Sequence, residues 1–232
     1  MSDTVGQENV IRVLDKGFLA LDGALASDLA VVNGARVSFN AESDEMTERD
    51  AGLIRFLIRH KHGSPFEHGY FRFLVKAPLF VVREHHRHRA GHSYNEWSGR
   101  YSKLEAEFYL PDYVRTQVGK PGAYSFEAVD EATRAAARQE IEKNAERAFQ
   151  SYERLLEQGV AKEVARAVLP LSTYTKYYWS CNPRSLMHFC SLRNSEQAQF
   201  EIREYAATAE SFLERLMPVT HEAFVENGRV AP

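Results

Sequence analysis

The chain has 232 residues, of which 44% are hydrophobic and 26% charged, so it can bury a core and is not expected to be disordered. A formal net charge of −3 excludes a general nucleic-acid binder, because such binding needs a basic face. The first ten residues are polar and no apolar run approaches membrane-spanning length. We therefore expect a cytoplasmic protein that folds as one domain over residues 1–232.

The amino-terminal part predicts short strands and connectors, because apolar pairs such as Val31 and Val32 alternate with glycine and with the turn signal Asn33-Gly34. A helix is predicted from the cap Thr47 to His62, before Gly63. Its apolar residues recur at helical spacing, at Leu53, Ile54, Leu57 and Ile58.

The middle of the chain contains one strand and one long helix. Residues 70–75 are β-prone and lead to Pro78, which can begin a helix that runs toward His88. A connector over residues 111–130 carries no clear pattern. Residues 130–158 are rich in Ala, Glu and Arg, with an apolar stripe, and predict the long helix.

The last third predicts a strand between helices. Residues 164–168 form a short helical piece before Pro170, and residues 173–179 are a β-branched and aromatic strand. Asn182-Pro183 reads as the cap and first position of a helix to Leu192, and a further helix spans residues 197–217. We therefore expect an α+β fold, rich in helices, with a minority sheet.

The strongest signal of function is residues 83–101, REHHRHRAGHSYNEWSGRY, with four arginines and four histidines. Arginine forks match phosphate oxygens, small residues such as Ser98 and Gly99 let backbone N–H groups approach a ligand, and the interleaved aromatic rings suit stacking. This pattern fits a nucleotide. A solvated basic face is the plain alternative.

A metal site is a second alternative, because His85, His88 and His92 have ligand-compatible spacing if they lie on one helix. The neighbouring guanidinium groups would oppose a cation, so we predict no metal. Cys181 and Cys190 match no metal-knuckle spacing and cannot form a disulfide framework. We expect both thiols to be reduced and buried, and neither lies in the arginine-rich block.

Arg87-His88-Arg89, eight intervening residues and Ser98 resemble the hallmark of flavin-dependent thymidylate synthases, the ThyX family, and the continuation through Tyr101 also matches. Three more blocks resemble that family in the same order: HGSPFEH at 62–68, RAVLP at 166–170, and residues 182–193. The similarity runs from about Ala35 to Met217. It implies a ThyX-like, mainly antiparallel sheet and reductive methylation of dUMP to dTMP with FAD, NADPH and methylene-tetrahydrofolate.

The resemblance also implies roles for individual residues. FAD contacts are implied for Ser64, Arg87, His88, Arg89 and Glu96, together with Asn182, Arg184 and His188 from a neighbouring subunit of a homotetramer. Contacts with dUMP are implied for Glu84, His85, His86, Arg87, Glu96, Trp97, Ser98, Gly99, Arg100, Arg166 and Arg193. Two positions depart from the family: Glu84 stands where many relatives have Gln, and His188 where some have Asn.

Arg193 is the implied catalytic residue. It would lie beside the N3/carbonyl edge of the pyrimidine and favour the anionic ring, which makes C5 electron-rich without a cysteine adduct. A salt bridge with a helix acid such as Glu196 or Glu201 is the structural alternative for this arginine. His62, Glu67 and His68 are plausible neighbours of the flavin.

Two other classes of function stay open at this point. A nucleotide-binding regulatory module would keep the cleft without chemistry, and a flavin reductase or oxidase would consume NADPH without dUMP. The separate arginine blocks favour a nucleotide substrate in addition to flavin. A Rossmann oxidoreductase is disfavoured, because the sequence contains no GxGxxG turn.

Overall fold

The computed structural model describes residues 6–120 and 123–232. Residues 1–5, which belong to the polar amino-terminal stretch, and residues 121–122, in the predicted connector, lie outside the described part. A five-stranded antiparallel sheet forms the centre, in the order β1-β2-β3-β7-β4. Its strands are β1 (Val10–Val13), β2 (Gly17–Leu25), β3 (Tyr70–Pro78), β4 (His92–Glu96) and β7 (Tyr174–Cys181).

Buried and exposed side chains alternate along the strands, so the two faces of the sheet differ. In β3, Phe71, Phe73 and Val75 are fully buried, whereas Arg72 between them is exposed. Strand β7 repeats the pattern, with a buried Trp179 next to a partly exposed Tyr178. One face is therefore the core face.

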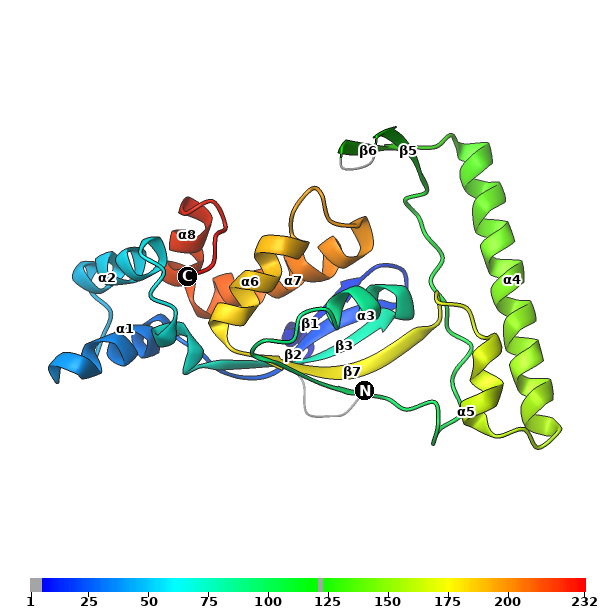
Figure 1. The fold of residues 1–232 in the computed structure, drawn as a ribbon, viewed down its shortest axis with the longest axis horizontal. Coiled ribbons are helices and arrows are strands. Elements are labelled where there is room, and N and C mark those ends of the chain that lie inside the picture. The colour runs from blue at the N-terminus through cyan, green and yellow to red at the C-terminus, as the bar shows by residue number, and fades with distance from the viewer. Residues whose placement is uncertain (1–5, 121–122) are drawn as a thin grey trace.

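Helices α3 (Leu79–His85), α6 (Pro183–Arg193) and α7 (Phe200–Leu216) cover this core face (Figure 1). The ring of Phe212 in α7 lies 5.8 Å from that of Phe73, and Phe189 in α6 lies 5.1 Å from Trp179. Burying large aromatic side chains contributes about 1.5–3 kcal/mol each. The sheet thus fixes the positions of α3 and α6, whose ends carry the candidate site.

Helices α1 (Asp28–Arg36), α2 (Glu48–Arg59) and α8 (Pro218–Glu226) pack together beside this layer (Figure 1). In α2, Thr47 and Asp50 form a capping box, which confirms the predicted helix start. Residues 28–36, however, are helical, so the prediction of strands and a turn there was wrong. Ser27 caps α1, Val31 and Val32 turn inward, and Asn33-Gly34 lies inside the helix.

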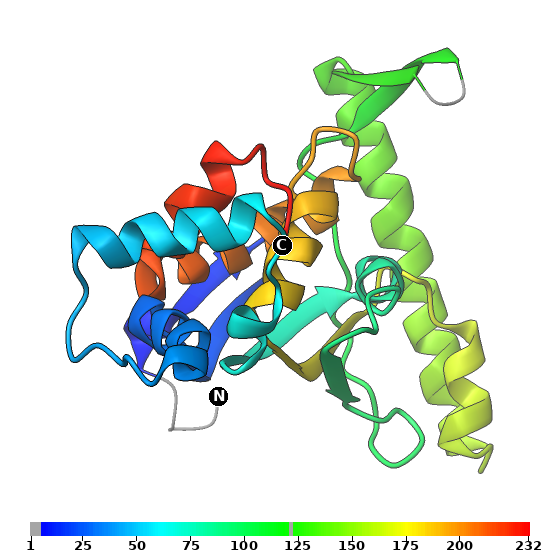
Figure 2. The ribbon, with the colours of Figure 1, turned by 60° about the vertical axis from the view of Figure 1, so that its left-hand side comes forward.

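Helix α4 (Glu131–Glu157) stands apart from the sheet, with α5 (Lys162–Ala165) near one end and the hairpin of β5 (Arg115–Lys120) and β6 (Ala123–Ala128) near the other (Figure 2). Helix α4 confirms the one predicted over residues 130–158, and the Asp130 side chain caps its start. Phe149, Tyr152 and Ala165 form a second, smaller core between α4 and α5. The hairpin lies in the stretch for which the sequence predicted only a connector.

The other predicted elements of the second half are confirmed. Asn182 caps α6, Pro183 is its first residue, and β7 covers the predicted strand. Pro218 ends α7 as expected, but it also begins α8, a helix that the sequence reading did not include. Strand β4 was likewise not predicted. Short 3-10 turns complete the chain at η1 (Gln7–Asn9), η2 (Val37–Phe39), η3 (Ser64–Glu67) and η4 (Arg166–Val168).

Both cysteines are buried free thiols, as predicted, and burial raises their pKa well above the ordinary value. Such thiols remain protonated and unreactive. Across residues 6–120 and 123–232, no helix has both the length and the apolar character needed to cross a bilayer.

We expect Asp28→Ala to lower the free energy of unfolding by about 1–2 kcal/mol. The buried Asp28 carboxylate accepts hydrogen bonds from the backbone N–H groups of Val219 and Thr220, both at 2.9 Å, so it caps α8 from a distant part of the sequence. Urea unfolding measures the change, with Asp44→Ala, at an exposed position, as the control. Equal midpoints for the two variants would contradict this role.

Candidate functional site

The arginine-rich block begins where α3 ends. His85 is the last helical residue, and the Tyr94 hydroxyl lies 3.1 Å from the carbonyl oxygen of His85 and 2.9 Å from that of His88, so it can donate to either. This contact holds the turn after the helix, with Arg87 and Arg89 exposed and His88 facing inward. Because the helix stops at His85, the helical spacing considered for a metal site does not occur.

The Arg193 guanidinium, at the end of α6, joins this turn. Its Nε donates to His88 Nε2 at 2.9 Å, and Nη1 donates to Glu84 Oε2 at 2.9 Å. Nη2 lies 3.4 Å from the carbonyl oxygen of Glu84. An arginine has five N–H donors, so two remain for a ligand. Arg193 thus forms a salt bridge with a helix acid, as the structural alternative predicted, but that acid is Glu84 of α3. The predicted partner Glu201 pairs with Arg115 instead.

The imidazoles next to Arg193 are neutral near pH 7. Burial, followed by the charge of Arg193, lowers the pKa of His88 to about 4, and burial also lowers the pKa of His92 to about 4. His88 accepts at Nε2, so its proton is on Nδ1. His92 accepts from Trp179 Nε1 at 2.9 Å through its Nδ1, so its proton is on Nε2.

The side chain of His85 lies in the core, 1% exposed. Its Nδ1 is 2.6 Å from the Tyr177 hydroxyl, and its ring stacks on Phe189. Burial lowers its pKa well below the ordinary value. Any contact of His85 with a nucleotide would therefore come from its backbone. The half-buried His86 packs on Tyr94 at a centroid distance of 4.5 Å.

A cavity of roughly 420 Å³ opens beside Arg193. Its walls combine guanidinium groups, imidazoles and small apolar surfaces, which suits a flat anionic ligand such as a flavin nucleotide. This cavity brings His188 next to Arg87 and His88 within one chain. It is lined by Arg87, His88, Arg89, Ala90, His92, His188, Leu192 and Arg193.

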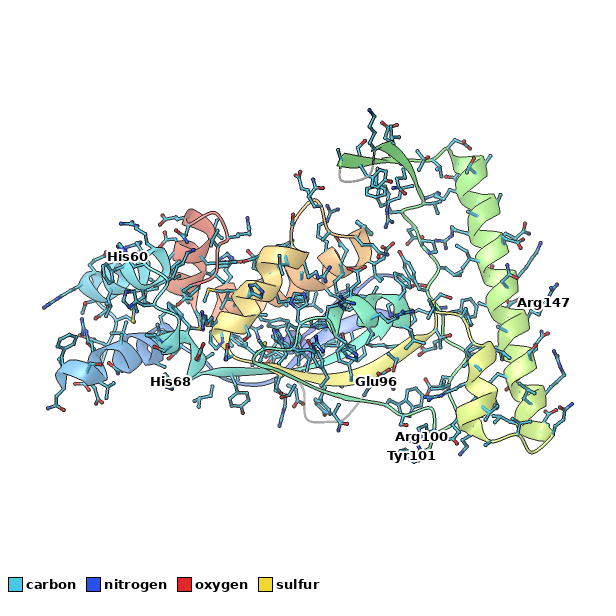
Figure 3. The ribbon with its side chains drawn as sticks, viewed as in Figure 1. His60, His68, Glu96, Arg100, Tyr101 and Arg147 are labelled. Atoms are coloured by element: carbon cyan, nitrogen blue, oxygen red, sulfur yellow. The ribbon has the colours of Figure 1, made fainter. Side chains whose placement is uncertain are left out.

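The second half of the arginine-rich block, from Glu96 to Tyr101, begins at the last residue of β4 and lies away from Arg193. Glu96 accepts from the Thr175 hydroxyl at 2.8 Å, and Trp97 packs on Lys176. Arg100 pairs with Glu163 of α5 at 3.1 Å, so it lies beside α5, whereas Glu96 lies along the sheet (Figure 3).

Gly99 belongs to this group and is close to Arg166, because a Cβ atom on Gly99 would lie 3.4 Å from the Arg166 side chain. Ser98 Oγ accepts from the Arg100 backbone N–H at 3.3 Å. No recorded hydrogen bond or ion pair of the described residues joins this group to Arg193. The predicted dUMP residues thus form two groups within a single chain.

Three predicted flavin residues lie near the start of α6. Arg184 pairs with Glu67 at 2.5 Å and donates to the carbonyl oxygen of Pro232 at 2.6 Å. Asn182 uses its side-chain oxygen to cap α6, and Ser64 is exposed in η3, which packs against α6. The sequence reading missed the contact of Arg184 with Pro232, because a backbone carbonyl carries no signal in the sequence. It also missed that Tyr94 holds the turn after α3.

Comparison with known proteins identifies the family. Residues 21–219 match the model of the family described as Thymidylate synthase complementing protein. A flavin-dependent thymidylate synthase of Thermosipho africanus is 45% identical over 93% of each chain. One from Streptomyces coelicolor is 43% identical over the full length of both chains.

Solved structures give the same result. A UMP/dUMP methylase, PolB, from Streptomyces cacaoi bound with 5-Br dUMP superposes with a TM-score of 0.87 at 44% identity, covering 96% of this chain and all of that one. The two chains therefore share the antiparallel sheet and its helical layer. The chain belongs to the family of flavin-dependent thymidylate synthases.

We expect Gly91→Ala to displace the turn after Arg89 and to weaken flavin binding. Gly91 has a φ of +71°, and a Cβ atom there would lie 2.1 Å from Ser185 Oγ, so alanine meets both backbone strain and a clash. Flavin absorbance retained after gel filtration measures the effect. Gly52→Ala is the matched control, because it lies in α2 with open space around it. Unchanged flavin content in Gly91→Ala would contradict this expectation.

The neutral histidines predict an acid sensitivity of the fold. His92 has a pKa of about 4 in the folded chain and about 6.5 when unfolded, so the unfolded chain takes up the proton first as pH falls. The stability that the neutral His92 contributes to the fold is fully present above pH ~6.5 and is lost progressively toward pH ~4. Urea unfolding between pH 7.5 and pH 5 should therefore show a shallower acid slope for His92→Asn than for the unchanged protein. Parallel slopes would show that His92 does not titrate in this way.

Proposed function

We propose that this protein methylates dUMP to dTMP, using methylene-tetrahydrofolate as the one-carbon donor and NADPH as the reductant. The observation that carries the proposal is the held Arg193 guanidinium, which keeps two donors free beside a cavity lined by Arg87 and Arg89. Membership of the family supports the same reaction.

Arg193 supplies the electrostatic part of this reaction. A guanidinium stays protonated at any physiological pH, and His88 and Glu84 fix its orientation before substrate arrives. Its two remaining N–H donors can serve one edge of a pyrimidine ring, where they stabilise negative charge on N3 and the adjacent carbonyl oxygen. Charge on that edge spreads to C5, the carbon that receives the methylene group.

The cavity beside Arg193 is the proposed flavin site. Bound FAD supplies the hydride chemistry that reduces the transferred one-carbon unit. Exposed Arg87 and Arg89 offer donors for its phosphates, and the imidazoles of His88 and His188 provide flat surfaces for its rings. Glu96, Ser64, Asn182 and Arg184 are further proposed contacts.

The remaining proposed dUMP residues at the end of α3 are His86 and the backbone of His85. Those that follow β4 are Trp97, Ser98, Gly99 and Arg100, with Arg166 beside them. This second group lies apart from Arg193, so we propose that two chains of a homotetramer each contribute one of the groups to a nucleotide site. The exposed position of Arg166 and Arg100 leaves their guanidinium groups accessible to a phosphate from another chain.

The direct test is anaerobic conversion of dUMP by the purified protein with FAD, NADPH and methylene-tetrahydrofolate. We expect dTMP only when all four components are present. NADPH consumption without dUMP would favour a flavin reductase, and nucleotide binding without product would favour a regulatory module. Parallel reactions with NADH and with UMP measure the preference for the reductant and for the sugar.

We expect Arg193→Ala to abolish dTMP formation, with a loss of at least about 100-fold in kcat, typical of removing a preorganised charge-stabilising donor. FAD should stay bound, because Arg87 and Arg89 are unchanged. Product formation and flavin absorbance measure the two effects separately. Substantial residual turnover by a flavin-loaded Arg193→Ala protein would exclude the proposed role.

A further inference from the structure

Glu84 is an ionisable carboxylate in direct contact with the proposed catalytic guanidinium. It is the penultimate residue of α3, before His85, and its Oε2 accepts from Arg193 Nη1 at 2.9 Å. The side chain of Glu84 is 29% exposed and that of Arg193 is 23% exposed. The pair is therefore partly desolvated, and its charges interact more strongly than they would in water.

The proposed function leaves one proton without a destination. An anionic pyrimidine forms only when the N3–H bond breaks, and a base must accept that proton. Arg193 cannot accept it, because a guanidinium has no free lone pair while it is protonated. His88 is a poor acceptor here, since its Nε2 already accepts from Arg193.

Charge balance disfavours an ionised Glu84 beside Arg193 once the anionic pyrimidine is bound. If the pyrimidine lost its proton to water, the anionic ring and the Glu84 carboxylate would share one guanidinium in a half-buried site. Two anions in such a position raise each other's pKa until one of them takes up a proton. Moving the proton from N3 to Glu84 keeps the total charge of the site constant.

We propose that Glu84 is the base that takes the N3 proton of the pyrimidine, so that the ion pair of Arg193 passes from the carboxylate to the ring. This inference rests on the proposed function. The N3–H bond breaks, an O–H bond forms on Glu84, and the electron pair stays on the ring. When the methylated product returns to its neutral form, the same proton goes back to N3. No oxidant or reductant takes part in this step.

The surroundings of Glu84 favour its protonated form. Burial raises its pKa, Arg193 on α6 lowers it, and the more distant carboxylate of Glu201 on α7 raises it again. His88, on the turn after α3, is neutral at physiological pH. Once the ring anion compensates Arg193, the main influence that keeps Glu84 ionised is removed.

The test is proton accounting during dUMP binding to the flavin-loaded protein. Calorimetry at pH 8.5 in buffers of different ionisation enthalpy gives the number of protons released. We expect almost none from the unchanged protein, because the proton only moves within the complex. Glu84→Gln keeps the size of the side chain and a hydrogen bond to Arg193 but cannot take a proton. This variant should release up to one proton more per site.

Equal proton release by the unchanged protein and Glu84→Gln would overturn the proposal and leave Glu84 a positioning residue. This readout needs no turnover, so it separates a failure of this inference from a failure of the proposed reaction. Glu222→Gln is the matched control, because it removes an exposed carboxylate that pairs with Arg55. It should match the unchanged protein.

The pH profile of kcat gives an independent measurement. Activity of the unchanged protein should fall at acid pH as Glu84 becomes protonated. Glu84→Gln should be less active than the unchanged protein near neutral pH, because its amide cannot accept the proton. Its activity should then rise with pH, because solvent must take the proton. Glu84→Asp should retain the acid limb. A Glu84→Gln profile that runs parallel to that of the unchanged protein would overturn the proposal.

Discussion

The Arg193 guanidinium connects the two segments on which the site depends. It lies at the end of α6 and contacts Glu84 at the end of α3 and His88 in the turn that follows. Both helices are anchored on the same face of the sheet by aromatic side chains, with Phe189 against Trp179. A rigid core therefore sets the separation of two helix ends, and one planar side chain spans it.

The neutrality of the neighbouring histidines follows from this arrangement. Burial and the positive charge of Arg193 both penalise an imidazolium at His88, so the ring serves as a hydrogen-bond acceptor instead of a second cation. Glu84 is the compensating charge. The nearest neighbours of the Arg193 guanidinium are thus one carboxylate and an uncharged imidazole, while Arg87 and Arg89 place further positive charge along the same cavity, which suits the binding of an anionic ligand.

Local signals allowed several elements to be predicted. Thr47 before α2 and Asn182-Pro183 at the start of α6 mark those helices through groups within a few residues. Composition and an apolar stripe mark α4. The four ordered motifs also identified the family. The errors occurred where distant contacts decide the structure: α1 is helical around Asn33-Gly34, and its first residue, Asp28, caps α8 almost two hundred residues away in the chain.

The sequence by itself determined the helix-rich class, the family and the identity of the arginine and histidine residues, because these depend on residue type and short-range order. Only the tertiary structure decided which of them meet. It placed Arg193 on Glu84 and not on Glu201, turned His85 into the core, and separated Arg100 and Arg166 from Arg193. Such pairings depend on how the sheet orients helices distant in sequence, and neither spacing nor composition contains that information.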